Sequence, residues 1–314
     1  LPSMGAANSD HLYIGIALCG VGIPLLISDK TLAQATYESK IGKFIFADFL
    51  GYREELFKVD ENAKPHRFSG QAMFLGLILG VLTFFIHPAI IIGILAVFVV
   101  CALIFVTPEA GILLSVFFLP FISLTEYPTV ILIAVTLVTV FSYFIKVIRG
   151  KRIIRMEIVD IAVAFFMLCL YLSGHVSVGG ENSYFSALVA CCLLIGYFLI
   201  VNLIRTGAWL NRFIYAVVVS GSITAFLGII QYALGFAVND WLDRSMFSDI
   251  YGRVTSTFDN PNYLAAYLAI VFPFALYLFN KAKGLAPKIL ASVACASIVL
   301  CVIFTWSRAA WIAL

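Results

Sequence analysis

The chain has 314 residues, of which 62% are hydrophobic and only 12% are charged, and its mean hydropathy is +1.05. Soluble domains are about 25% charged, so this composition excludes a soluble globular protein. The formal net charge of +3 is small and lies in a few loops. It therefore marks membrane topology, and we expect no nucleic-acid partner.

Long apolar runs fill most of the chain, at about 11–27, 71–87, 89–106, 110–125, 128–148, 158–173, 184–204, 213–238, 262–280 and 289–306. Only helices and closed barrels satisfy the backbone hydrogen bonds in lipid, and these runs lack the alternation of barrel strands. The sequence therefore predicts an all-α, polytopic transmembrane protein with about ten spans plus the start of another. Prolines at 108, 120 and 128 interrupt the runs between 107 and 127, where one segment could be re-entrant.

A short basic loop sets the orientation; it holds Lys146, Arg149, Lys151, Arg152 and Arg155. The positive-inside rule places this loop in the cytoplasm. Counting spans from it puts the loops 205–212 and 281–288 in the cytoplasm and the loops 174–183 and 239–261 outside. The charges agree with this assignment, because 239–261 contains four aspartates and two arginines.

The N-terminal part, 1–70, is expected to hold one span and a cytoplasmic insert. The insert is nearly balanced in charge and has aromatic and aliphatic residues typical of an amphipathic helix on the membrane surface, namely Phe44, Phe46, Phe49, Leu50, Tyr52, Leu56 and Phe57. An inert connector is the alternative. We expect 71–238 to form a transmembrane bundle and 239–314 to form a third part. The chain ends shortly after a new apolar run begins, so we expect a C-terminally truncated fragment of a longer protein.

Signatures of soluble enzymes are missing from the sequence: it has no phosphate-binding glycine loop, no H-E-x-x-H and no Cys-x-x-Cys. The seven cysteines lie in apolar runs without metal-ligand spacing, so we expect no metal and no cofactor. Small residues from Ser220 to Ala225, with Gly228 beyond, predict a helix-packing face. His87 and His175 are general-base candidates on the outer side, or simply interfacial polar residues.

The stretch 252–265 is a polar island between two spans. It contains Arg253, three hydroxyl side chains (Thr255, Ser256 and Thr257) and the sequence Asn260-Pro261-Asn262. Asn260 is a helix-capping residue and Pro261 suits a first helical turn, so a helix is predicted over 262–280. An arginine fork, hydroxyl groups and unpaired N–H groups at a helix start can together bind a diphosphate. The alternative is a capped helix with an interfacial arginine.

A second arginine, Arg308, follows Ser307 where the 289–306 span reaches the same outer side. One such arginine can extend to the lipid headgroups. Two on one side, both beside hydroxyl residues, favour a shared lipid-borne anion.

These residues carry a resemblance. The sequence from Arg253 through Asn260-Pro261-Asn262, followed by a span and by Ser307-Arg308, resembles the O-antigen ligase and O-antigen polymerase superfamily. Members are glycosyltransferases of the bacterial inner membrane that act at its periplasmic face. The resemblance covers roughly 250–314, and 239–314 would then be the start of the ligase or polymerase core.

The resemblance implies a multi-pass inner-membrane enzyme of surface polysaccharide synthesis. Its donor is a glycan on undecaprenyl diphosphate, and its acceptor is a glycan, a lipid or a protein. Arg253 and Arg308 would bind the donor diphosphate, supported by Thr255, Ser256, Thr257, Asn260, Pro261, Asn262 and Ser307. The catalytic residue is not assigned. A polytopic transporter or flippase for a lipid-linked or anionic substrate is the alternative function.

Overall fold

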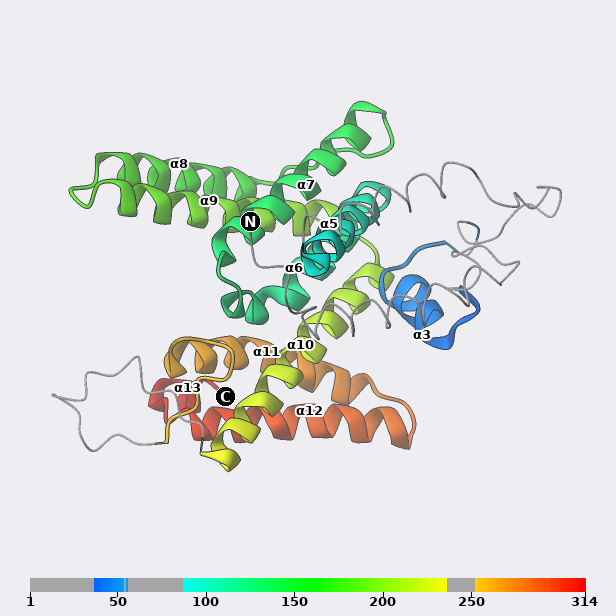
Figure 1. The fold of residues 1–314 in the computed structure, drawn as a ribbon, viewed down its shortest axis with the longest axis vertical. Helices are drawn as coiled ribbons and strands as arrows, with labels where there is room; N and C mark the ends of the chain where they lie inside the picture. The colour runs from blue at the N-terminus through cyan, green and yellow to red at the C-terminus, as the bar shows by residue number, and fades with distance from the viewer. Residues whose placement is uncertain (1–36, 54, 56–86, 236–251) are drawn as a thin grey trace, which may run out of the picture. The chain divides into compact units, whose positions relative to one another are not determined.

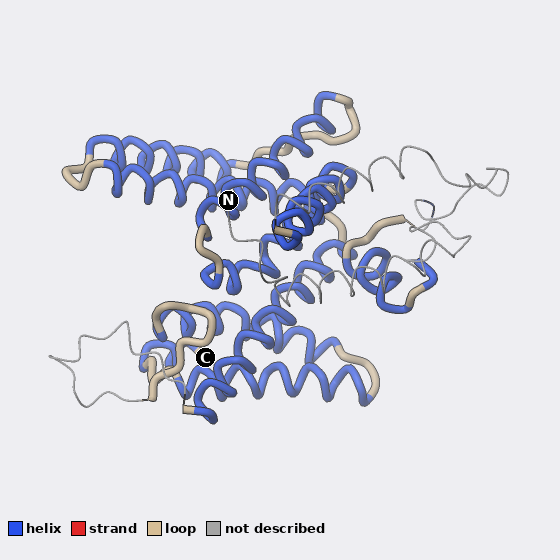
Figure 2. Tube along the Cα trace, in the orientation of Figure 1, coloured by secondary structure: helices blue, strands red, loops and turns tan. Residues whose placement is uncertain are grey.

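The computed structural model describes residues 37–53, 55, 87–235 and 252–314, and within these ranges every regular element is a helix (Figures 1 and 2). The predicted all-α class is confirmed for this part of the chain. The apolar run at 11–27 and nearly all of the run at 71–87 lie outside the described residues. So do Leu56 and Phe57 of the predicted amphipathic insert.

The chain divides into two compact units, 1–103 and 104–314. In the first unit, α3 (Lys40–Lys43) is a single turn capped by Ser39 and continues as the π-helix η1 (Phe44–Phe49). Gly51 then adopts a left-handed conformation with φ of 74°, which ends the helix because only glycine enters this region without steric cost. The described part of the insert is therefore a short helical segment. Helix α5 (Pro88–Val106) begins in this unit. Near the end of this helix, the Leu103 carbonyl accepts a hydrogen bond from the Tyr52 hydroxyl at 2.7 Å.

The second unit contains α6 (Pro108–Phe118), the 3₁₀ helix η3 (Leu119–Leu124), α7 (Pro128–Ile148), α8 (Ile158–Val176), α9 (Glu181–Leu203), α10 (Gly207–Leu234), α11 (Pro261–Lys281), α12 (Leu285–Phe304) and α13 (Arg308–Ala313). Among the described helices, the six from α7 to α12 are long and apolar enough to cross a membrane. The stretches Ile90–Val106 and Pro108–Leu124 are apolar but shorter. The chain is thus a multi-pass membrane protein by length and composition of its helices, and the total of about ten spans stays a prediction.

Prolines and glycines set the helix boundaries. Pro108, Pro128 and Pro261 each occupy the first turn of a helix, where the missing N–H group has no intrahelical partner to lose. Pro120 lies in the first turn of η3, directly after α6. Gly235 ends α10 in the left-handed conformation, with φ of 71°. These positions explain why the apolar sequence between 107 and 127 forms two short helices and no single long span.

The core of the second unit lies where α10, α11 and α12 pack together (Figure 1). Leu264 and Leu268 of α11 and Ile298 of α12 are fully buried there. The predicted small-residue face of α10 is confirmed, because Ser220, Gly221, Thr224, Ala225 and Gly228 are all buried. In contrast, many large apolar side chains on the outer faces of the helices are exposed, among them Phe165 (67%) and Ile270 (67%). Such surfaces are expected where helices face lipid.

The predicted cytoplasmic loop folds back onto the first turn of α6. Arg152 forms an ion pair with Glu109, whose side chain is fully buried. The second carboxylate oxygen of Glu109 has no hydrogen-bond partner among the described residues. Nearby, the Asn202 side-chain oxygen accepts hydrogen bonds from the Arg205 guanidinium at 2.6 Å and from the Arg155 backbone N–H at 3.0 Å. This polar cluster fixes the ends of α6, α7 and α9.

Candidate functional site

The segment 252–260 is fastened along α10 by one glutamine. The Gln231 side-chain oxygen accepts from the backbone N–H groups of Thr255 (3.2 Å) and Ser256 (2.7 Å), and its amide nitrogen donates to the Thr255 hydroxyl at 3.4 Å. The Ser256 hydroxyl donates to the Thr224 carbonyl of α10 at 2.7 Å. These bonds hold Ser256 at a φ of 52°, a left-handed conformation that a non-glycine residue adopts only when its surroundings enforce it.

Close packing also fixes the segment. A Cβ atom on Gly228 would lie 2.6 Å from the Cys301 sulfur of α12 and 3.0 Å from a methyl carbon of Val254. Val254 itself is buried, and its backbone N–H donates to the Phe304 carbonyl at 3.2 Å. The segment therefore lies between α10 and the end of α12. At position 228 of α10, no side chain larger than hydrogen fits without displacing a neighbour.

Gly228→Ala is expected to destabilise the protein by about 1–3 kcal/mol, because the added methyl group overpacks the contact with Cys301 and Val254. The measurement is the free energy of unfolding of the detergent-solubilised protein. Gly196→Ala is the matched control: this helical glycine has no atom within 4 Å of the added carbon, so it should be neutral or stabilising. Equal stability of the two variants would contradict the packing described.

Arg253 joins two segments that are far apart in the sequence. Its Nε donates to the Thr305 carbonyl at 2.7 Å, and one terminal nitrogen donates to the Asn262 side-chain oxygen at 2.9 Å. The guanidinium thus connects the start of α11 with the turn after α12. Burial lowers the pKa of Arg253, because desolvation disfavours the charged form. A nearby anion would offset this desolvation.

Arg308 is the first residue of α13, and its side chain is exposed and makes no hydrogen bond or ion pair within the described ranges. The tight turn before it contains Thr305, Trp306 and Ser307. Thr305 is fully buried, and its hydroxyl accepts from the Ser307 backbone N–H at 3.3 Å. The structure therefore places Arg308 three residues from the carbonyl that Arg253 binds, at the same end of α11 and α12.

Asn260 caps α11 as predicted: its side-chain oxygen accepts from the Asn262 N–H at 2.8 Å, and Pro261 is the first helical residue. The prediction of unpaired N–H groups at this helix start is wrong, however. Pro261 has no N–H group, the Asn262 N–H is taken by the cap, and the Tyr263 N–H donates to the Asn260 carbonyl at 3.1 Å. The helix start can therefore supply its partial positive charge, whereas the N–H groups of Asn262 and Tyr263 are already paired.

We expect Asn260→Ala to be expressed nearly normally, since the lost cap is worth only about 1 kcal/mol. If the site serves the glycan transfer that the resemblance implies, the turnover should nevertheless fall clearly, because Asn262 would lose its fixed backbone and Arg253 would lose a rigid partner. The measurement is the transfer rate per unit of membrane-inserted full-length protein. Asp259→Asn, at an exposed neighbouring position, should have the smaller effect. A wild-type rate in Asn260→Ala would show that the cap does not position the site.

The predicted supporting hydroxyls hold the segment in place. Thr255 and Thr257 are 2% and 6% exposed, and Ser256 is bonded to α10. The Thr257 hydroxyl is buried without a partner among the described residues, while its carbonyl accepts from the Ser123 hydroxyl of η3. Sequence reasoning missed Gln231 and Ser123 as supports. The only signal for Gln231 was a polar residue inside the apolar run 213–238.

The histidine candidates lie in other surroundings. His175, at the end of α8, stacks on Tyr171 with ring centroids 6.5 Å apart and also contacts the ring of Tyr184. His87 precedes α5. The ring contacts described for His175 involve Tyr171 and Tyr184 and no residue of the segment 252–260.

The described arrangement offers two arginines at one end of a helix pair: Arg253 on a segment held by tertiary hydrogen bonds, and Arg308 at the start of α13. It suits an anion that approaches from outside the helix bundle. No group of three or more His, Cys, Asp or Glu side chains lies together as metal ligands would within the ranges that the structure describes. Searched against known proteins, the chain matches no protein-family model, no curated protein and no solved structure.

Proposed function

We propose that this chain binds the glycan donor of a membrane glycosyltransferase, a ligase or polymerase that transfers a glycan from undecaprenyl diphosphate at the outer face of the bacterial inner membrane. The observation that carries the proposal is the position of Arg253. It is held by Thr305 and Asn262 at the turn that leads directly into Arg308. Two guanidinium groups at one boundary of a multi-pass membrane protein match the charge of a lipid-borne diphosphate.

The chemistry requires charge neutralisation on the leaving group. An acceptor hydroxyl attacks the anomeric carbon from the face opposite the diphosphate, so the new glycosidic bond forms with inversion. The bond from the anomeric carbon to the diphosphate oxygen breaks, and its electron pair leaves with the lipid diphosphate. Arg253 and Arg308 stabilise the charge that develops on that oxygen. The acceptor proton passes to a base that this chain does not identify.

The transporter or flippase alternative has less support from the described helices. Transporters place their coupling charges near the middle of the bilayer, in broken helices. In the second unit the charged residues of the helices lie near helix ends: Glu109, Lys146, Asp160, Glu181, Arg212, Lys281, Lys288 and Arg308. Charge at helix ends suits a reaction at the membrane surface.

The test is transfer by the full-length protein in proteoliposomes that contain a polyprenyl-diphosphate-linked glycan and an acceptor. We expect transferred glycan and released polyprenyl diphosphate without added nucleotide sugar or divalent metal. Movement of the donor between leaflets without transfer would favour the flippase alternative.

Orientation is the control for this assay. A reporter active only in the periplasm should give signal when fused within 239–261 and none when fused at Lys283. The opposite pattern would place both arginines in the cytoplasm and overturn the proposal.

A further inference from the structure

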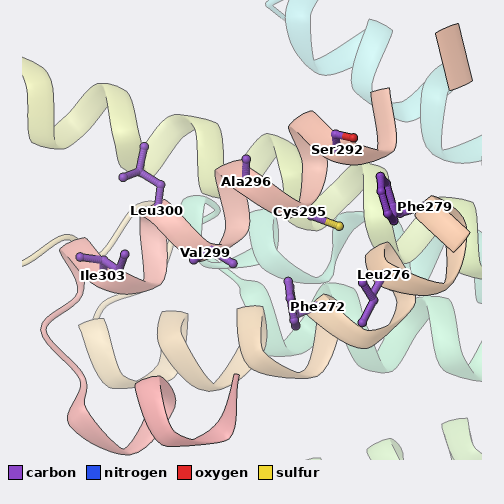
Figure 3. Close-up of a pocket in the computed structure, with 9 residues that line it drawn as sticks. All are labelled: Phe272, Leu276, Phe279, Ser292, Cys295, Ala296, Val299, Leu300 and Ile303. Atoms are coloured by element: carbon purple, nitrogen blue, oxygen red, sulfur yellow. The ribbon is translucent and has the colours of Figure 1, made fainter. Parts of the chain in front are cut away.

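The loop 149–157, which joins α7 to α8 (Figure 1), combines positive charge with exposed apolar side chains. Ile153, Ile154 and Met156 are 72%, 49% and 62% exposed, although they belong to no helix. Exposed apolar side chains are ordinary on a helix face in hydrocarbon. The groove between α11 and α12 in Figure 3 is such a face, and none of its nine labelled lining residues is charged. In the loop, by contrast, the apolar side chains stand among basic residues.

The backbone of this loop is held against the ends of several helices. Besides the ion pair with the first turn of α6 described above, the Ile153 carbonyl accepts from the Tyr143 hydroxyl of α7 at 3.2 Å. The Arg155 backbone N–H donates to the Asn202 side-chain oxygen of α9 at 3.0 Å. A ligand of this loop would therefore meet a backbone that is already ordered, which lowers the entropic cost of binding.

Three basic side chains of the loop have no partner among the described residues. Arg149, Lys151 and Arg155 are exposed, and their side chains make no hydrogen bond or ion pair there. The acidic groups nearby are already engaged. Glu157 and Asp160 form a reciprocal capping box at the start of α8, and the buried carboxylate of α6 has its arginine partner. The loop therefore presents uncompensated positive charge beside an apolar surface.

We propose that the loop 149–157 binds anionic phospholipids of the leaflet that it faces. The three unpaired basic side chains bind the lipid phosphate groups, as basic segments next to a membrane span do. Ile153, Ile154 and Met156 enter the boundary between headgroups and acyl chains, where apolar side chains add to the binding. A free phosphate ion would satisfy only the cations and would leave the apolar side chains in water. This binding site lies on the predicted cytoplasmic side and does not depend on the proposed function.

Photocrosslinking to lipid tests the proposal. A photoreactive amino acid replaces Ile154 in the full-length protein, which is reconstituted into vesicles of phosphatidylethanolamine with a minor share of phosphatidylglycerol. Leu285, which is 79% exposed at the start of α12, is the control position on the same predicted side. The measurement is the ratio of the two lipid adducts, relative to the ratio in the vesicles. We expect phosphatidylglycerol to be enriched at least about fivefold at 154, since one basic residue near the surface contributes about that factor. The enrichment at 285 should be clearly smaller, because the neighbouring Lys281 already donates to Asn211 at 2.6 Å.

Removing the three unpaired charges makes the test specific. Arg149→Gln, Lys151→Gln and Arg155→Gln, combined in one variant, should bring the lipid ratio at 154 to that of the vesicles and leave the ratio at 285 unchanged. Exposed charges contribute little to stability, so this variant should insert normally. Equal enrichment at the two positions, or enrichment at 154 that survives the triple change, would overturn the proposal.

Other occupants of the loop would give different results. Crosslinks at 154 between two copies of the chain, without lipid adducts, would show a protein interface in place of a lipid site. Loss of the enrichment in inorganic phosphate, but not in chloride of the same ionic strength, would show that free phosphate is the ligand, because general screening acts equally in both. Should the triple variant not insert, the comparison of positions 154 and 285 in the otherwise unchanged protein decides.

Discussion

Arg253→Ala in the full-length protein is expected to lower glycan transfer by about 10²–10³-fold, the usual loss when one group that stabilises a developing negative charge is removed. The leaving diphosphate would then depart with only Arg308 beside it. The measurement is the initial rate of transfer per unit of membrane-inserted protein. Arg308→Ala should produce a comparable loss, since both guanidinium groups face one charge in the proposed site.

Arg253→Lys should restore activity only in part, because an ammonium group cannot reproduce a two-point fork. Arg212→Ala is the matched control. This arginine lies near the other end of α10 with its guanidinium 4.7 Å from the ring centroid of Trp209, so transfer should be unchanged. Full activity in Arg253→Ala would remove that residue from the site. Loss of the protein from the membrane would instead show that its bonds to Thr305 and Asn262 are mainly structural.

Arg152→Met is expected to have the largest effect on stability. Removing the partner of a buried carboxylate typically destabilises a protein by 3–5 kcal/mol. The Arg152 side chain is 40% exposed and that of Glu109 is fully buried, so we expect about 3 kcal/mol, the lower end of that range. The measurement is the free energy of unfolding of the solubilised protein at neutral pH.

The companion variants make this prediction specific. Lys151→Met removes an exposed charge from the same loop and should change stability little. Adding Glu109→Gln to Arg152→Met should recover part of the loss, because the buried group is then neutral. If Arg152→Met and Lys151→Met unfold alike, the ion pair does not hold the loop onto α6.

The sequence predicted the helices well where apolar runs are long and a proline or cap marks the start. The run at 128–148 coincides with α7, and Asn260 and Pro261 begin α11 as expected. It predicted less well between 107 and 127, where Pro120 leads the chain into a 3₁₀ turn directly after α6. Local chemistry determines these boundaries, and local chemistry can be read from sequence.

The support of the candidate site was not predictable in the same way. Gln231 binds a segment 24 residues away, and Ser123 binds one 134 residues away. Such contacts depend on how the helices pack, which a single sequence does not show. The hydroxyls at 255–257 were predicted to support a ligand, yet two are buried and one is bonded to α10. Composition identified the polar segment, whereas only tertiary structure shows which atoms face inward.

The bridge formed by Arg253 links ligand occupancy to the geometry of two helices. An anion that recruits this guanidinium competes with the Asn262 oxygen and the Thr305 carbonyl for the same donors. Asn262 also donates its backbone N–H to the cap at Asn260. An anion bound to Arg253 would consequently replace the Asn262 oxygen and the Thr305 carbonyl as hydrogen-bond acceptors, and its departure would let these two bonds form again. Binding and release of the anion would then move the start of α11 and the end of α12.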